Sequence, residues 1–474
     1  MIHFGLESYA GYVLYGAGIL AFLLSVFWRP IVGIYYLLPL IPLQTVRYHL
    51  IDFPLGRSIV DITLLGVLLG LLMHRQSIIV KTPWNVVLSL YAIFTFVSLC
   101  QGSFYLDSSL PFSLSDQRLA DWKNYMVMPV ILFVVAAAVK ETRQMKVLVI
   151  LMCVGTLMLD RSFWDTVSGR DFSSFSYDLQ ENSEMGYAGV NGLATFEAQI
   201  SMFLLALAAF ERKRLLQLGY LALSFFSMNC LMYSLSREGY LAFLAGCLFL
   251  GLVKQRKFLV LLAVFAFTWS SLVPGAVLQR VQMTYDKDEG KLDHSSQVRV
   301  DLWEEALPIF NANPLLGVGF DTYAYTKHVH DYRDSHNVYV KFLVETGIAG
   351  LLLFLWLVAR TFRTGYRLFR HGKDPFLSSL GLGLAAWVIC AAVANFFGDR
   401  WTGAFLQING YMWVLAGLVS RALMLEQSAA QFGAKEDSLV DKTADVHETP
   451  EPQAVAVAQT GLYLHDPRQV IATQ

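Results

Sequence analysis

Long apolar runs recur along most of the chain, and they restrict its possible folds more than any other feature. A helix needs about 20 mostly apolar residues to cross a bilayer core. Thirteen runs approach this length, at residues 9–28, 30–46, 58–73, 83–100, 124–139, 145–164, 190–210, 214–235, 238–253, 257–274, 337–359, 376–397 and 402–422. We therefore predict an all-α polytopic membrane protein with about 12–13 transmembrane helices.

The composition of the chain excludes an ordinary soluble enzyme. Of its 474 residues, 55% are hydrophobic and 15% are charged, whereas about 25% of the residues of a soluble domain are charged. The net charge of −1 leaves no basic field for nucleic acid. The five cysteines all lie in apolar runs, where a thiol packs as a small hydrophobe: Cys100, Cys153, Cys230, Cys247 and Cys390.

The loops between the runs differ in charge, and this difference predicts the orientation in the membrane. Basic clusters follow alternate runs, for example Arg212–Arg214 and Lys254–Lys257, and such loops remain in the cytoplasm. Residues 165–184 are rich in acids and face outward. The run at 30–46 holds three prolines and could be a kinked or half-inserted helix. Thirteen spans place the N-terminus outside, and twelve place it inside.

We divide the chain into three regions by composition. Residues 1–189 hold the N-terminal transmembrane helices. Residues 190–422 form a second transmembrane domain with a long polar loop at 275–336, far longer than a connection requires. Residues 423–474 are poor in apolar side chains, so we predict a disordered cytoplasmic tail.

The loop at 275–336 contains a predicted helix and a turn. Asp293–Ser296 offers capping residues ahead of apolar residues at helical spacing that end near Asn313. Arg299 then lies in the first turns of this helix. Gly317–Gly319 predicts a plain turn. Ser335 is the predicted N-cap of the next span, which places His336 at the positive end of a helix that favours a neutral imidazole.

Three arginines lie at predicted outer ends of spans, where an unpaired charge is costly. Each has a carboxylate as its sequence neighbour, because Arg237 precedes Glu238, Arg161 follows Asp160 and Arg400 follows Asp399. A structural ion pair between neighbours is one interpretation. The other is an anion site, because guanidinium groups grip phosphate oxygens in two-point fashion.

Two patterns for metal binding are weak. The histidines and acids at residues 328–336 match no zinc spacing. Asp286 and Asp288 resemble the acid pair that holds a divalent ion in nucleotide-sugar enzymes, but they are predicted to lie outside the cell. We therefore predict no metal and no cofactor.

Three segments together resemble the O-antigen ligase and polymerase superfamily. They are Leu235–Ala242, then Arg299–Ala306 running on to Phe320, and then His336–Gly350, which begins with the pair His336 and Asn337. The resemblance covers about residues 190–360. It implies a C-type membrane glycosyltransferase fold in the bacterial inner membrane, with the active site on the periplasmic side.

The resemblance also implies a reaction and roles for residues. The donor is a glycan on undecaprenyl pyrophosphate, and the reaction is metal-independent and inverting. His336 activates the acceptor, while Arg237 and Arg299 hold the pyrophosphate, to which we add Arg161 and Arg400. Glu238, Asn337 and Asp399 support the site, and Glu345 is predicted to orient Lys341 or a catalytic group.

The acceptor remains open at this point. Lipid A core would make the protein a ligase, a growing glycan would make it an O-antigen or exopolysaccharide polymerase, and a protein hydroxyl would make it an oligosaccharyltransferase. A transporter of the same lipid-linked sugar is the alternative from another class, and it predicts charges buried in mid-span. Membrane lipids are the remaining expected partners.

Overall fold

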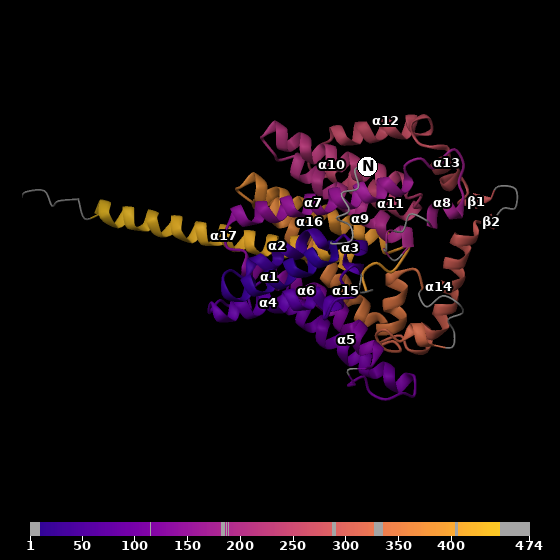
Figure 1. The fold of residues 1–474 in the computed structure, drawn as a ribbon, viewed down its shortest axis with the longest axis horizontal. Coiled ribbons are helices and arrows are strands. Elements are labelled where there is room, and N and C mark those ends of the chain that lie inside the picture. Colours follow the sequence, from indigo (N-terminus) through magenta and orange to yellow (C-terminus); the bar gives the residue numbers. More distant parts are fainter. Residues whose placement is uncertain are drawn as a thin grey trace, which may run out of the picture. The chain divides into compact units, whose positions relative to one another are not determined.

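The computed structural model describes residues 10–113, 115–181, 185, 187, 189–286, 291–326, 335–402 and 406–445. The first half of this part of the chain consists of α1 (Ala10–Phe27), α2 (Ile31–Leu40), α3 (Gln44–Tyr48), the short 3-10 helix η2 (Gly56–Ser58), α4 (Ile59–Met73), α5 (Asn85–Tyr105), α6 (Gln117–Ala138), α7 (Thr142–Val167) and α8 (Tyr177–Glu181). The second half consists of α9 (Gly189–Ala208), α10 (Arg214–Tyr233), α11 (Arg237–Val253), α12 (Lys257–Leu272), α13 (Gly275–Gln282), strands β1 (Tyr285–Asp286) and β2 (Lys291–Leu292), α14 (His294–Ala312), η3 (Tyr323–Tyr325), α15 (Val338–His371), α16 (Pro375–Ala394) and α17 (Leu406–Asp445) (Figure 1).

Ten helices among the described residues are long and apolar enough to cross a membrane, and an eleventh span results if α12 and α13 are joined across their 109° bend. This confirms the predicted all-α polytopic membrane fold. The run at 30–46 is different, because α2 has ten residues and contains Pro39. At 1.5 Å per residue it is about 15 Å long and does not span a bilayer core by itself. The half-inserted alternative fits this helix.

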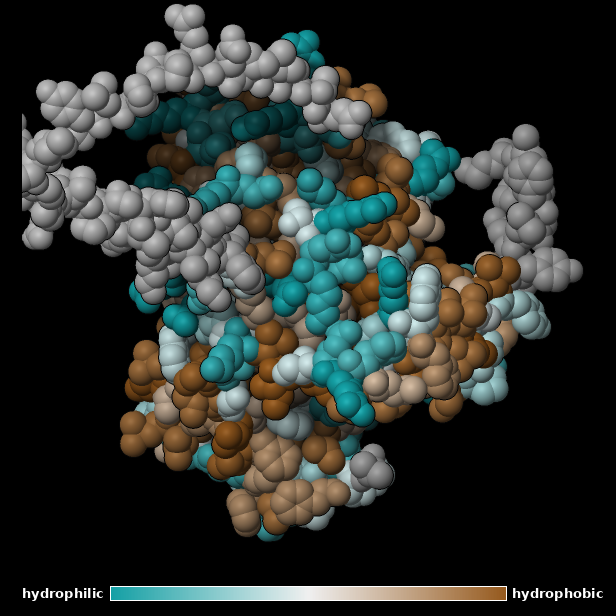
Figure 2. All heavy atoms as spheres, turned by 90° about the vertical axis from the view of Figure 1, so that its left-hand side faces the viewer, coloured by the Kyte–Doolittle hydropathy of each residue, from teal (hydrophilic) through white to brown (hydrophobic). Residues whose placement is uncertain are grey.

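Burial divides the helices into central and peripheral ones. In the most apolar stretch of each helix, 89% of the residues of α9 and 78% of those of α16 and α17 are buried, against 22% for α1 and 28% for α10. Helix α12 has no buried residue at all. Figure 2 shows hydrophilic residues gathered across the middle of one face, with hydrophobic residues bordering them. The peripheral helices therefore present apolar side chains to lipid.

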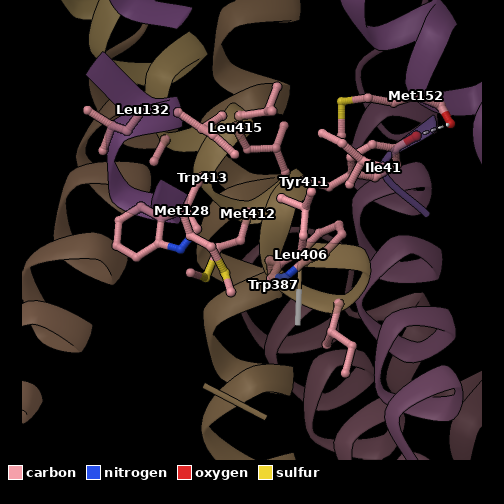
Figure 3. Packing of buried hydrophobic residues seen from close by; sticks show 14 of the residues in the cluster. Ile41, Met128, Leu132, Met152, Trp387, Leu406, Tyr411, Met412, Trp413 and Leu415 are labelled. Atoms are coloured by element: carbon pink, nitrogen blue, oxygen red, sulfur yellow. Dashed lines mark hydrogen bonds between the residues drawn. The ribbon is translucent and has the colours of Figure 1, made fainter. Parts of the chain in front are cut away.

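The start of α17 is fixed by a buried tyrosine. Tyr411 Oη donates hydrogen bonds to the carbonyl oxygens of Leu38, at 3.1 Å, and Met152, at 3.3 Å. Figure 3 shows Tyr411 pointing toward Met152, with the fully buried Trp387 and Trp413 close by. These contacts hold α17 against α2 and α7.

Two carboxyl side chains lie inside the bundle. Asp160 of α7 and Glu197 of α9 are both fully buried, and Ser227 Oγ donates to Asp160 Oδ2 at 2.7 Å. The sequence placed the ionisable residues at the outer ends of the spans, and Glu197, nine residues into α9, does not follow that expectation.

The polar loop folds largely as its sequence predicts. Strands β1 and β2 pair antiparallel, with Tyr285 opposite Leu292. Helix α14 confirms the predicted amphipathic helix, because the Asp293 side chain caps it by accepting from the Ser296 backbone N–H, and Asn313 ends it. Helix α14 lies next to α15 (Figure 1). The positive φ angles of Gly317 and Gly319 are consistent with the predicted turn.

The chain divides into two compact units, Met1–Glu426 and Gln427–Gln474. Helix α17 continues to Asp445, so residues 423–445 are helical where we predicted a disordered tail. Alanine, glutamine, glutamate, lysine and leucine are frequent in this stretch, and all of them favour the helix, which the apolar content alone did not reveal. Residues 446–474 lie outside the described residues.

Candidate functional site

A tight corner between α10 and α11 places Arg237. Leu235 adopts a positive φ of 57°, which reverses the chain after α10. Ser236 then caps α11 by accepting from the Gly239 N–H, and its hydroxyl donates to Asn191 Oδ1 at 2.6 Å. Arg237 is consequently the first residue of α11, at the end of the helix that points toward the loop at 275–336.

The Arg237 guanidinium is bound by residues of that loop. It donates to Thr284 Oγ1 at 2.9 Å, to Asp293 Oδ2 at 2.8 Å and to Ser295 Oγ at 2.6 Å. Burial acts to raise the pKa of Asp293, but hydrogen bonds from Arg237 and from Ser296 outweigh it and the pKa is lowered. Asp293 therefore remains a carboxylate, and it ties α11 to the start of α14.

Arg299 connects α14 to the loop at 395–402. Its Nε donates to the Phe397 carbonyl oxygen at 3.1 Å and its Nη1 to the Ser295 carbonyl oxygen at 2.8 Å. Burial lowers the pKa of Arg299, and the charges that act on it are those of Glu238, Arg237, Arg400 and Asp293. These side chains form one electrostatic group.

Arg400 and Asp399 are neighbours in sequence but pair with different elements. Arg400 Nε lies 3.1 Å from Glu238 Oε1, which also accepts from Thr195 Oγ1 at 3.1 Å. Asp399 Oδ2 lies 3.0 Å from Lys341 Nζ of α15. Burial acts to raise the pKa of Asp399, but the charge of Lys341 and the bonds from Thr402 lower it overall.

The ion pairs suggested by sequence adjacency are thus replaced by long-range ones. Arg237 pairs with Asp293 instead of Glu238, and Arg400 pairs with Glu238 instead of Asp399. We call Arg237, Arg299 and Arg400, with Arg280 of α13 and the carboxylates of Asp293 and Glu238, the arginine cluster.

Arg161 differs from the other predicted arginines. Its side chain is 58% exposed and pairs with Asp165 one turn later on α7, at 3.0 Å. Asp160, its sequence neighbour, points into the bundle. No contact between described residues joins Arg161 to the arginine cluster. The structure therefore brings together Arg237, Arg299 and Arg400 but leaves Arg161 apart.

His336 lies just before α15 in a conformation that is unusual for a residue with a side chain. Its φ is 49°, and the N-cap of α15 is Asn337, whose side chain accepts from the N–H groups of Tyr339 and Val340. The predicted N-cap, Ser335, instead uses its hydroxyl to donate to the Asn337 carbonyl oxygen. The prediction was wrong by two residues, because the left-handed turn at His336 delays the helix. His336 nevertheless stays at the N-terminal end of α15.

Two elements of the arginine cluster also hold the start of α15. Trp303, one turn after Arg299 on α14, donates from Nε1 to the Ser335 carbonyl oxygen at 3.0 Å. The Val338 N–H donates to the Asn395 carbonyl oxygen at 3.0 Å, two residues before Phe397, which binds Arg299. His336 is therefore anchored by the same helix and loop that position Arg299.

Glu345 makes backbone contacts that the sequence does not predict. Its two carboxylate oxygens accept from the backbone N–H groups of Asp321, at 3.0 Å, and Tyr323, at 3.2 Å. It therefore fixes the chain that leaves the Gly317–Gly319 turn. Lys341 binds Asp399 and Thr402.

Sequence reasoning missed Arg280 and the hydroxyl groups around Arg237. Arg280 Nη1 lies 3.7 Å from Asp293 Oδ2. The available signal was a single basic residue within the amphipathic stretch Gly275–Gln282. Thr284 and Ser295 carried no signal, because their role depends on contacts 47 and 58 residues away in the chain.

Most of the candidate metal ligands in the sequence lie outside the described residues. His328, His330, Asp288 and residues 331–334 lie outside the described residues. Within the described ranges, the structure holds no group of three or more histidine, cysteine or acidic side chains that could bind a metal ion.

Comparison with known proteins matches one part of the chain to a protein family. Residues 222–355, which run from α10 to the middle of α15, match the family model described as O-antigen ligase. This range contains Arg237, Arg280, Arg299 and His336. No curated protein matches the chain significantly.

Proposed function

We propose that this membrane protein transfers a glycan from undecaprenyl pyrophosphate to a hydroxyl acceptor, because residues 222–355 match the O-antigen ligase family model. The reaction takes place at the periplasmic face of the bacterial inner membrane. The arginine cluster binds the pyrophosphate, and His336 activates the acceptor. The transfer inverts the anomeric carbon and requires no metal ion.

The observation that carries this proposal is the imbalance of charge beside the start of α15. Arg237, Arg299 and Arg400 face two carboxylates, those of Asp293 and Glu238. Among the described residues, three guanidinium groups against two carboxylates leave an excess of one positive charge even before Arg280 is counted. Each esterified phosphate carries about one negative charge, and arginine forks bind such oxygens in two-point fashion. A pyrophosphate thus complements the cluster.

The reaction follows from this placement. The acceptor hydroxyl attacks the anomeric carbon of the glycan while the imidazole of His336 takes its proton. The bond between that carbon and the phosphate oxygen breaks, and its electrons pass to the pyrophosphate. Fixed guanidinium groups stabilise this developing charge without reorganising. Attack opposite the leaving group inverts the anomeric carbon.

The ligase reaction is our first choice of acceptor chemistry, with lipid A core as acceptor. A polymerase that extends a growing glycan, as in O-antigen or exopolysaccharide synthesis, uses the same donor side. Transfer to a protein hydroxyl is the third choice. The acceptor does not alter the roles of the arginine cluster or of His336.

Replacement of His336 tests the proposal. In cells that lack the native gene, we expect His336→Ala to give no capped lipid or polymer while the lipid-linked donor accumulates. Protein abundance in the membrane, compared with the Arg161→Gln variant, controls for folding. Wild-type glycan from a normally abundant His336→Ala variant would exclude His336 as the proton acceptor.

A further inference from the structure

Arg280 of the arginine cluster is buried, although some of its hydrogen-bond donors have no acceptor in the part of the chain that the structure describes. Arg280 is 6% exposed, and neither Nε nor Nη1 has a hydrogen-bond partner among the described residues. A buried polar group without a partner is destabilising, and more so when it is charged. Two unsatisfied donors on one guanidinium therefore point to a ligand that supplies acceptors.

The surroundings of Arg280 indicate an anionic ligand with an apolar side. Asp293 Oδ2 lies 3.7 Å from Arg280 Nη1 but 2.8 Å from Arg237 Nη2, so of these two guanidinium groups only that of Arg237 is hydrogen-bonded to it. With Arg280 included, four guanidinium groups face two carboxylates among the described residues, an excess of two positive charges. On the other side, the Arg280 guanidinium lies 4.7 Å from the ring centre of Phe175 and 5.5 Å from that of Tyr177.

Helix α13 carries Arg280 and follows the exposed helix α12 in the chain. Pro274 and Val273 connect α13 to α12, which has no buried residue. The Ala276 N–H donates to the Phe172 carbonyl oxygen, and Gln279 Oε1 accepts from the Phe175 N–H. Figure 1 shows α8 and α13 on the same side of the molecule, as these bonds require. Arg280 therefore lies on a short helix that follows α12 and is tied to the segment at residues 172–175.

The contacts within the arginine cluster form a path from Arg280 to His336. From Arg280 it continues through Asp293 to Arg237, then through Ser295 to Arg299, and from α14 to His336. One end, on the helix that follows the exposed α12, lies beside aromatic side chains, and the other adjoins the proposed proton acceptor. A polyprenyl pyrophosphate has the same polarity, because its chain is apolar and its glycan bears the reacting carbon.

We propose that Arg280 binds the phosphate nearer the polyprenyl chain, while Arg299 binds the phosphate that carries the glycan and Arg237 bridges the two. This rests on the proposed function. Phe175 and Tyr177 then offer aromatic surface to the first isoprene units. The bond that breaks leaves its charge on the phosphate that carries the glycan, so Arg280 contributes to donor binding and Arg299 to the rate of transfer.

The test compares Arg280→Gln and Arg280→Lys with the wild-type full-length protein in detergent. Calorimetric titration uses farnesyl diphosphate as the probe and farnesol as the control for the chain alone. We expect Arg280→Gln to weaken binding of farnesyl diphosphate about tenfold or more and Arg280→Lys to weaken it less, with farnesol unaffected. The KM for the undecaprenyl-linked donor should rise similarly, with kcat changed less than about threefold.

Asp293→Asn provides a second, independent variant. Asparagine still caps α14, whereas the loss of the carboxylate removes a competitor for the guanidinium groups. We expect farnesyl diphosphate to bind severalfold more tightly to this variant. Arg161→Gln is the matched control for removal of an arginine at an outer helix end, and it should bind farnesyl diphosphate as the wild type does.

The outcomes separate this inference from the proposed function. Any of three results would overturn the role of Arg280. The first is that Arg280→Gln keeps the wild-type affinity and KM, and the second is that it loses only kcat. The third is that Asp293→Asn binds farnesyl diphosphate no more tightly than the wild type, or more weakly. If those results accompany loss of transfer in the His336 and Arg299 variants, the proposed function survives without Arg280. Normal transfer in the His336 and Arg299 variants would instead remove the proposed function.

Discussion

Helices α7 and α11 look alike in sequence at the ends that we predict to face outward, but they differ there in structure. Each presents an arginine beside an acid, Arg161 after Asp160 and Arg237 before Glu238. The Arg237 side chain is 16% exposed and is held by a carboxylate 56 residues away, whereas that of Arg161 is 58% exposed and pairs within its own helix. The difference teaches that a functional arginine is recognised by partners on other elements, since an exposed pair within one helix contributes little.

The largest expected effect is a loss of glycan transfer on replacement of Arg237, compared with replacement of Arg161. Arg237→Gln should reduce the rate of glycan transfer by about 100-fold or more, because it removes a fixed donor from the developing charge on the pyrophosphate. Arg161→Gln should change the rate less than about twofold. Transfer is measured with purified protein and equal amounts of correctly folded enzyme. Equal effects of the two substitutions would contradict the distinction.

Replacement of arginine by lysine tests whether the shape of the guanidinium group matters in addition to its charge. Arg299→Lys keeps the charge but cannot donate to both the Phe397 and Ser295 carbonyl oxygens from one planar fork. We expect kcat to fall about tenfold with a smaller change in KM. Arg161→Lys is the control, and its kcat should stay at the wild-type value. A rise in KM alone for Arg299→Lys would assign Arg299 to ground-state binding.

The two kinds of ion pair should also differ in coupling energy. A double-mutant cycle on Glu238 and Arg400, which pair in a buried environment, should give about 1–3 kcal/mol. The same cycle on Arg161 and Asp165 should give less than about 0.5 kcal/mol. Thermal unfolding in detergent provides the measurement. Similar coupling in the two pairs would show that burial does not distinguish them.

The smallest expected effect concerns the start of α15. Asn337→Ala removes the N-cap and should cost about 1 kcal/mol of stability, with a fall in transfer because His336 precedes the cap. Ser335→Ala removes a single hydroxyl hydrogen bond and should cost less. A greater loss of stability in Ser335→Ala than in Asn337→Ala would show that Ser335 is the N-cap, as the sequence suggested.

Local interactions were predictable and distant ones were not. The helix after Asp293 follows from a cap and apolar spacing within some twenty residues, and α14 confirms it. The cap of α15 was misplaced because nothing local indicates that His336 adopts a left-handed turn. Arg237, Arg299 and Arg400 were predicted as site residues. The sequence suggested only a neighbouring carboxylate as the partner of Arg237 and Arg400, and it suggested no partner for Arg299. Their actual partners depend on how α9, α11, α14 and the loop at 395–402 pack.

Release of free undecaprenyl pyrophosphate tests the central claim most directly. Purified wild-type protein with a lipid-linked glycan donor and an acceptor should release it in equal amount to the glycan transferred. His336→Ala, at the same amount of folded protein, should release none above background while still binding the donor. Release and transfer by His336→Ala at the wild-type rate would contradict the account.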